Sequence, residues 1–190
     1  MATRFTVSES AGTIDPHPPA WLVALVRTID RFTHGFANLF ACLVIPLVFA
    51  VVYEVTARYL FGKPTIWAYD ASYMLYGSHF MLGAAYALYR GAHIRTDIFY
   101  QNWSERTKGL IDASLYLFFF FPGMIFYFWM SWQEFLHAYT IWERSEASPW
   151  RPLIWPFKGV IPLAAALLLI QGIAEFLKSG WAAITGRRLI

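Results

Sequence analysis

The sequence predicts an all-α integral membrane protein with four transmembrane helices. Hydrophobic residues make up 58% of the 190 residues and charged residues only 14%, whereas soluble domains are about 25% charged. Four stretches are almost free of charge, and each approaches the roughly 20 residues that cross a bilayer as a helix. We therefore expect spans at residues 35–57, 70–90, 111–133 and 159–178.

The segments outside these spans are too short to form a second folded domain. We expect a flexible lead at residues 1–20, where prolines disfavour a helix, and a single membrane domain at residues 21–190. Apolar side chains recur at helical spacing from Trp21 to Phe32. This pattern fits either a short helix at the membrane interface or an N-terminal extension of the first span.

Basic residues are distributed unevenly between the two sides of the predicted membrane. The side with both termini and the second loop has ten, at Arg4, Arg27, Arg31, Arg90, Arg95, Arg106, Lys108, Lys178, Arg187 and Arg188. The other side has five, at Arg58, Lys63, Arg144, Arg151 and Lys158. The positive-inside rule therefore predicts that both termini are cytoplasmic. Because these residues flank spans and do not form an aromatic and basic surface, we expect no nucleic-acid partner.

Two features of the spans concern their shape and packing. Prolines fall inside three of them and predict kinks, at Pro46, Pro122 and Pro162. Small residues recur every fourth position in the second span, which is typical of a close helix contact, at Gly83, Ala87 and Gly91. We expect no polar stripe through the centre of the spans, and no metal-ligand spacing or phosphate-binding loop is visible.

Three polar residues in or beside the spans allow more than one interpretation. Glu54 lies one turn before Arg58, which favours an interfacial ion pair; the alternative is a proton-exchanging carboxylate of a small autonomous exporter. Asp70 begins the second span and is expected to pair with Arg58 or Lys63 across the short loop. His79 lies in the middle of that span, which favours a hydrogen bond between helices; the alternative is a ligand of haem in a redox-complex anchor.

Three short segments follow one another in a familiar order. They are Arg58-Tyr59-Leu60-Phe61-Gly62-Lys63-Pro64 with Trp67, Arg90 with His93-Ile94-Arg95-Thr96-Asp97, and Ser148-Pro149 before a last span that contains a proline. In order and spacing, the chain resembles the DctQ-type small membrane subunit of tripartite ATP-independent periplasmic (TRAP) transporters from about residue 30 to residue 178. Many members of that family carry two adjacent acidic residues where this chain has Tyr69 and Asp70.

The resemblance implies a non-enzymatic scaffold without a cofactor, in the inner membrane of a bacterium. Its implied partners are membrane lipid, a large polytopic subunit and a periplasmic binding protein. In such systems the large subunit moves the substrate, commonly an organic acid, by an elevator motion driven by a sodium gradient. The residues expected to have structural or subunit-interface roles are Arg58, Trp67, Asp70, Arg90, His93, Arg95, Asp97, Ser148, Pro149, Trp150 and Trp155.

Overall fold

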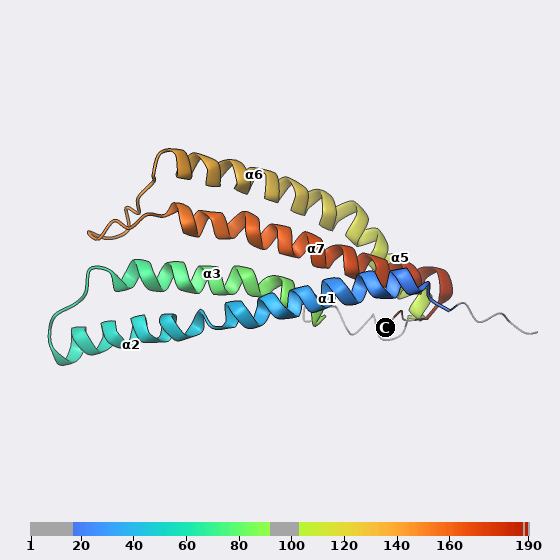
Figure 1. Ribbon diagram of the computed structural model, residues 1–190, viewed down its shortest axis with the longest axis horizontal. Helices are drawn as coiled ribbons and strands as arrows, with labels where there is room; N and C mark the ends of the chain where they lie inside the picture. The colour runs from blue at the N-terminus through green and yellow to red at the C-terminus, as the bar shows by residue number, and fades with distance from the viewer. Residues whose placement is uncertain (1–16, 92–102, 188, 190) are drawn as a thin grey trace, which may run out of the picture.

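The computed structural model describes residues 17–91, 103–187 and 189, and these residues form helices and connecting loops (Figure 1). The elements are α1 (Ala20–Ala41), α2 (Val44–Leu60), α3 (Ala68–Tyr89), α5 (Glu105–Leu115), the π-helix η1 (Tyr116–Phe120), α6 (Phe121–Thr140) and α7 (Trp155–Thr185). The one bridge of β type among the described residues joins Arg144 to Leu153. The predicted all-α fold class is therefore confirmed.

Three helical segments are long and apolar enough to cross a membrane: Ala20–Leu60, which contains α1 and α2, Glu105–Thr140 and Trp155–Thr185. Helix α3 has 22 residues, which is sufficient length at about 1.5 Å per residue. It is nevertheless not among the three, because tyrosines, serines and His79 lower its hydropathy. Four transmembrane helices and their orientation remain predictions.

Residues 20–41 form one uninterrupted helix. The segment between Trp21 and Phe32 therefore continues directly into the first predicted span, as the second of the two interpretations expected. Its apolar side chains pack against α7, where Leu22 and Val26 form a cluster with Ala174 and Leu189.

The first predicted span is interrupted at Cys42 and Leu43, between α1 and α2. Pro46 lacks the N–H group that would continue the hydrogen-bond ladder. At this point the helical hydrogen bonds span three residues instead of four, since the N–H of Leu43 donates to the carbonyl of Phe40 at 3.0 Å. A second predicted kink coincides with η1, because the wider π-helical turn immediately precedes Pro122 in α6. Figure 1 shows the chain curving between α5 and α6.

Helix α7 is the centre of the structure. It packs against α1, α3, α5 and α6, whereas α2 packs mainly against α3. Figure 1 shows α7 running between α6 and α3, with α2 and α6 on opposite sides of the molecule. Buried alanines of α7, such as Ala165 and Ala174, allow its neighbours to approach closely. Ala164 and Leu167 of α7 pack with Leu82 and Ala85 of α3 in a buried cluster.

The start of α1 and the end of α7 lie at the same end of the molecule (Figure 1), which we call the terminal end. The α2–α3 loop (residues 61–67) and the α6–α7 loop (residues 141–154) lie at the other end, which we call the loop end. Whether these two ends face opposite sides of a membrane stays a prediction.

Close helix contacts occur at glycines other than the expected ones. A Cβ atom at Gly109 of α5 would lie 2.7 Å from the Ser179 carbonyl oxygen of α7, and one at Gly77 of α3 would lie 2.8 Å from the Phe157 ring. At Gly83, in contrast, a Cβ atom would meet nothing within 4 Å, and Gly91 ends α3 with a φ of 64°. The predicted close contact along Gly83 and Gly91 is therefore wrong for the described residues, because α7 approaches α3 on another face.

Candidate functional site

Asp70 ties the start of α3 to the α6–α7 loop. Its side chain is buried, with 1% exposed, and its carboxylate accepts hydrogen bonds from the hydroxyl of Ser145, at 2.8 Å, and from the hydroxyl of Ser148. The position in the first turn of a helix also favours a negative charge. Asp70 was expected to pair with Arg58 or Lys63, but the structure instead gives it two serines from a loop 75 positions and more along the chain.

The α6–α7 loop folds back on itself before it reaches Asp70. The Ser145 N–H donates to the Pro152 carbonyl at 2.8 Å, and the Ile154 N–H donates to the Glu143 carbonyl at 2.9 Å. Arg151 has a positive φ of 47°, which reverses the chain at the tip. The two predicted residues Pro149 and Trp150 lie at this tip and are exposed. Pro149 and Trp150 therefore form an exposed apolar surface at the tip of a loop that its own hydrogen bonds hold in place.

Glu54 holds the end of α2 against the α2–α3 loop. The Arg58 side chain donates to its carboxylate, with Nε at 2.8 Å, which confirms the predicted ion pair. The other carboxylate oxygen accepts from the N–H of Thr65 at 2.9 Å and from the Thr65 hydroxyl. Trp67, a predicted interface residue, lies in the same region with its ring 5.7 Å from that of Tyr53. Glu54 is thus engaged in fixing the loop.

Lys158 joins α6, the α6–α7 loop and α7. Its ammonium lies 2.7 Å from a carboxylate oxygen of Glu134 and 2.7 Å from one of Glu143. Trp155, one turn earlier, packs edge-on against Tyr139 at 5.3 Å between ring centroids. Its indole N–H is buried without a hydrogen-bond partner among the described residues. Lys158 and Trp155 therefore close the loop end of the α6–α7 pair.

The terminal end contains a polar cluster between α1 and α7 that the sequence analysis missed. Gln171 is fully buried and accepts a hydrogen bond from the hydroxyl of Thr33 at 2.7 Å. Its amide donates to Asp30 at 3.0 Å and to Glu175 at 3.1 Å. The ammonium of Lys178 bridges the same two carboxylates, at 3.0 and 2.8 Å. The cluster lies at the terminal end, and the expectation that no polar stripe runs through the centre of the spans stays a prediction.

The signal for this cluster was present in the sequence. Gln171, Glu175 and Lys178 are spaced by four and three residues, which places them on one face of a helix. Their partner Asp30 lies 141 positions before Gln171, and no pattern in one sequence indicates that such distant segments meet.

His79 makes the expected hydrogen bond between helices. Its Nδ1 lies 3.2 Å from the carbonyl oxygen of Phe40, which is located where α1 ends. The Phe40 carbonyl lies at the break between α1 and α2, outside the regular hydrogen-bond ladder of a helix. With its proton on Nδ1, His79 donates a hydrogen bond to this carbonyl. The ring is only partly buried, and Asn38, Gly83 and Tyr86 line the same cavity of about 300 Å³.

The structure describes only the first two residues after α3, Arg90 and Gly91. Arg90 follows the last helical residue and is exposed. The predicted residues His93, Arg95 and Asp97 lie outside the described residues, so their structural or subunit-interface role stays a prediction.

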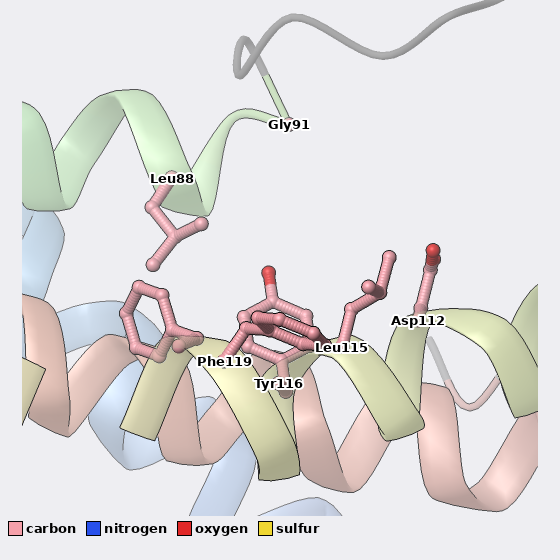
Figure 2. Close-up of a pocket in the computed structure, with 7 residues that line it drawn as sticks. Leu88, Gly91, Asp112, Leu115, Tyr116 and Phe119 are labelled. Carbon is pink, nitrogen blue, oxygen red and sulfur yellow. The ribbon is translucent and has the colours of Figure 1, made fainter. Parts of the chain in front are cut away.

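Two apolar grooves open on the surface of the described helices. The first has a volume of about 490 Å³ and lies between the end of α3 and the α5–η1 stretch. Figure 2 shows Leu88 and Gly91 on one side of it and Leu115, Tyr116 and Phe119 on the other. The second groove, of about 530 Å³, lies between α2 and α3 and is lined by tyrosines of α3. Both grooves are open to whatever surrounds the helices.

The large side chains on the outer faces of α2 and α6 are exposed. On α2 they include Ile45, Val48, Phe49, Val52 and Tyr59, and on α6 they include Ile125, Phe126, Trp129 and Met130. Contiguous apolar faces of this kind are covered by lipid or by protein. Within the described parts of the chain, no group of three or more His, Cys, Asp or Glu side chains is placed to hold a metal ion.

One comparison with known proteins finds a match. The family model described as "Tripartite ATP-independent periplasmic transporters, DctQ component" matches residues 47–179. This range contains α3, α5, α6, most of α2 and most of α7. No curated protein and no solved structure matches the chain.

Proposed function

Because the chain belongs to the DctQ family of TRAP transporter components, we propose that it is the small subunit that holds a large, substrate-moving membrane subunit in place. The family is a transporter component and not an enzyme. Family membership and the long apolar helices also make the chain a multi-pass membrane protein. The proposal adds the inner membrane of a bacterium, four spans with cytoplasmic termini, and a scaffold role.

The main support for a scaffold is that the polar side chains of Asp70 and of the Gln171 cluster find their hydrogen-bond partners within the chain. Asp70 holds the α6–α7 loop at one end, and the Gln171 cluster joins α1 to α7 at the other. Helix α7 connects these anchors and contacts α1, α3, α5, η1 and α6. A subunit that resists the motion of its neighbour needs such connections at both membrane surfaces, because apolar packing alone gives little directional restraint in lipid.

The exposed faces of α2 and α6 supply the surface for the partner and for lipid. The two helices lie on opposite sides of the molecule (Figure 1), and each has exposed large apolar and aromatic side chains. The large subunit would cover one of them, and lipid would cover the other. The periplasmic binding protein would approach the loop end, where Trp150 is exposed at the tip of the α6–α7 loop.

We further propose that the complete system imports an organic acid with a sodium gradient. Substrate selection would belong to the binding protein and the large subunit. The autonomous exporter is not favoured, because the carboxylate of Glu54 already accepts hydrogen bonds from Arg58 and Thr65. The haem anchor is not favoured either, because the matched family is a transporter component.

Co-purification with photo-crosslinking tests the scaffold proposal. A photoreactive amino acid is placed at Phe49 on α2 or at Phe126 on α6, both exposed, and the chain is co-expressed with the large subunit. One of the two positions should give a crosslink to the large subunit, whereas the buried control position Ala165 should give none. A chain that purifies without the large subunit and gives no crosslink from either face would contradict the proposal.

A further inference from the structure

A polar cavity lies where α3 ends before its neighbours do. It has a volume of about 280 Å³ and is lined by Asp30 of α1, Tyr89 and Arg90 at the end of α3, and Lys178 of α7. Helices α1 and α7 extend beyond the end of α3 at the terminal end (Figure 1). The cavity therefore has two helical walls, with the last residues of α3 as its floor.

The charged wall of the cavity is held in a fixed geometry. Lys178 lies 3.0 Å from Oδ2 of Asp30 and 5.6 Å above the ring of Tyr89, and the buried amide of Gln171 donates to Oδ1 of Asp30. Both members of the ion pair remain partly accessible, with 16% of the Asp30 side chain and 21% of the Lys178 side chain exposed. Asp30 can therefore accept a further hydrogen bond from a ligand in the cavity.

The cavity offers charges of both signs. Arg90 is exposed at its floor, and no side-chain hydrogen bond joins it to another residue of the described segments. Among the lining residues, Arg90 and Lys178 are the cations and Asp30 is the carboxylate, and Lys178 is also paired with Glu175 behind the lining. A purely anionic ligand would gain from Arg90 but would be repelled by Asp30. A ligand with adjacent positive and negative groups matches both.

We propose that this cavity binds the headgroup of a zwitterionic phospholipid that has a primary ammonium, such as phosphatidylethanolamine. The phosphate would accept hydrogen bonds from Arg90, and the ammonium would donate to Asp30. A quaternary ammonium cannot donate to the carboxylate, so the site distinguishes ethanolamine from choline headgroups. The proposal depends on the chain lying in a membrane and not on its scaffold role.

The depth of the cavity fits a lipid. Arg90 follows the last turn of α3, and residues 70–90 are the predicted second span, so the cavity lies at the level of a membrane interface. Toward the loop end, Phe36 of α1 and Leu82 of α3 belong to an apolar cluster with Leu167 of α7. A bound headgroup would therefore have its acyl chains beside the helices.

Native mass spectrometry of the purified full chain with defined lipids tests the proposal. Phosphatidylethanolamine, phosphatidylcholine and phosphatidylglycerol with identical acyl chains are added in equal amounts. One charge-assisted hydrogen bond corresponds to about a tenfold preference, so we expect phosphatidylethanolamine to be retained about tenfold better than phosphatidylcholine. Equal retention of the three lipids, or a preference for phosphatidylglycerol, would overturn the proposal.

Two variants separate the contributions of the headgroup. Asp30→Asn should remove the preference for ethanolamine over choline, and Arg90→Gln should weaken retention of all three lipids. Arg58→Gln at the loop end is the matched control and should change neither. If Asp30→Asn does not fold, Arg90→Gln alone tests the site, because the Arg90 side chain is exposed and lies outside the buried cluster. Unchanged lipid retention in Arg90→Gln would contradict the proposed site. Displacement of the lipid by soluble glycerophosphoethanolamine at equal concentration would also contradict a lipid ligand.

Discussion

The carboxylate of Asp70 lies 2.8 Å from the hydroxyl of Ser145, although 75 positions separate them in the chain. The contact connects the first turn of α3 to the loop between α6 and α7, and Ser148 makes a second hydrogen bond to the same carboxylate. Because Asp70 is buried, both bonds are shielded from water. The resemblance to the DctQ family drew attention to Asp70 and Ser148 separately, and the structure places them together.

Replacing Asp70 with alanine should destabilise the protein and release the α6–α7 loop. Removing a buried charged acceptor that two hydroxyls use costs about 1–3 kcal/mol. Thermal unfolding in detergent should show the loss of stability, and limited proteolysis should show faster cleavage within residues 141–154. Glu146→Ala is the control, because Glu146 is exposed in the same loop. Equal stability of the two variants would show that the Asp70 contacts contribute little.

Gly109→Ala should separate α5 from α7. The added methyl group would meet the α7 backbone, 2.7 Å from the carbonyl oxygen of Ser179, and overpacking of this kind costs about 1–3 kcal/mol. Gly83→Ala meets nothing within 4 Å and should be neutral or stabilising, since alanine favours helices by about 0.5–1 kcal/mol over glycine. Chemical denaturation of both variants in the same detergent checks the difference. If Gly83→Ala were less stable than Gly109→Ala, the close contact between α5 and α7 at Gly109 would be contradicted.

Gln171→Leu should weaken the attachment of α1 to α7. The substitution leaves the hydroxyl of Thr33 without its acceptor and removes one donor from Asp30 and one from Glu175. Buried groups that lose their partners cost about 1–3 kcal/mol each. Gln133→Leu, at an exposed position of α6, makes the same chemical change and should have almost no effect. Hydrogen exchange in α1 should rise in the first variant only.

The orientation of the helices can be tested by labelling with a membrane-impermeant thiol reagent. The native Cys42 is first replaced with alanine, and single cysteines are introduced at Glu146 in the α6–α7 loop and at Thr107 in α5, both exposed. The excess of basic residues at the terminal end predicts labelling at residue 146 and protection at residue 107 in intact cells. The reverse pattern would invert the topology.

Hydrophobic periodicity and charge located most helices correctly. The predicted span at residues 70–90 corresponds closely to α3 (Ala68–Tyr89), and Glu54 with Arg58 forms the pair that their spacing indicated. Local patterns were sufficient there because the interacting groups are neighbours on one helix.

The errors concern interactions between distant segments. Asp70 was assigned to the nearest cations because a single sequence shows proximity only along the chain. Gly83 and Gly91 formed a plausible stripe, but the helix that approaches α3 does so at Gly77. The cluster of Asp30, Gln171 and Lys178 depends on how α1 packs against α7, which neither hydropathy nor charge counting specifies.

Uptake by the reconstituted three-component system tests the scaffold account most directly. Proteoliposomes contain this chain, its large subunit and the binding protein, and the chain carries either its natural sequence or Glu54→Gln. Glu54 binds Arg58 and Thr65 and has no proposed contact with substrate or sodium. The account therefore predicts that the substrate half-saturation constant and the sodium dependence are unchanged in the variant, and that omitting this chain abolishes uptake. A shifted sodium dependence in Glu54→Gln, or uptake by this chain without the large subunit, would contradict it.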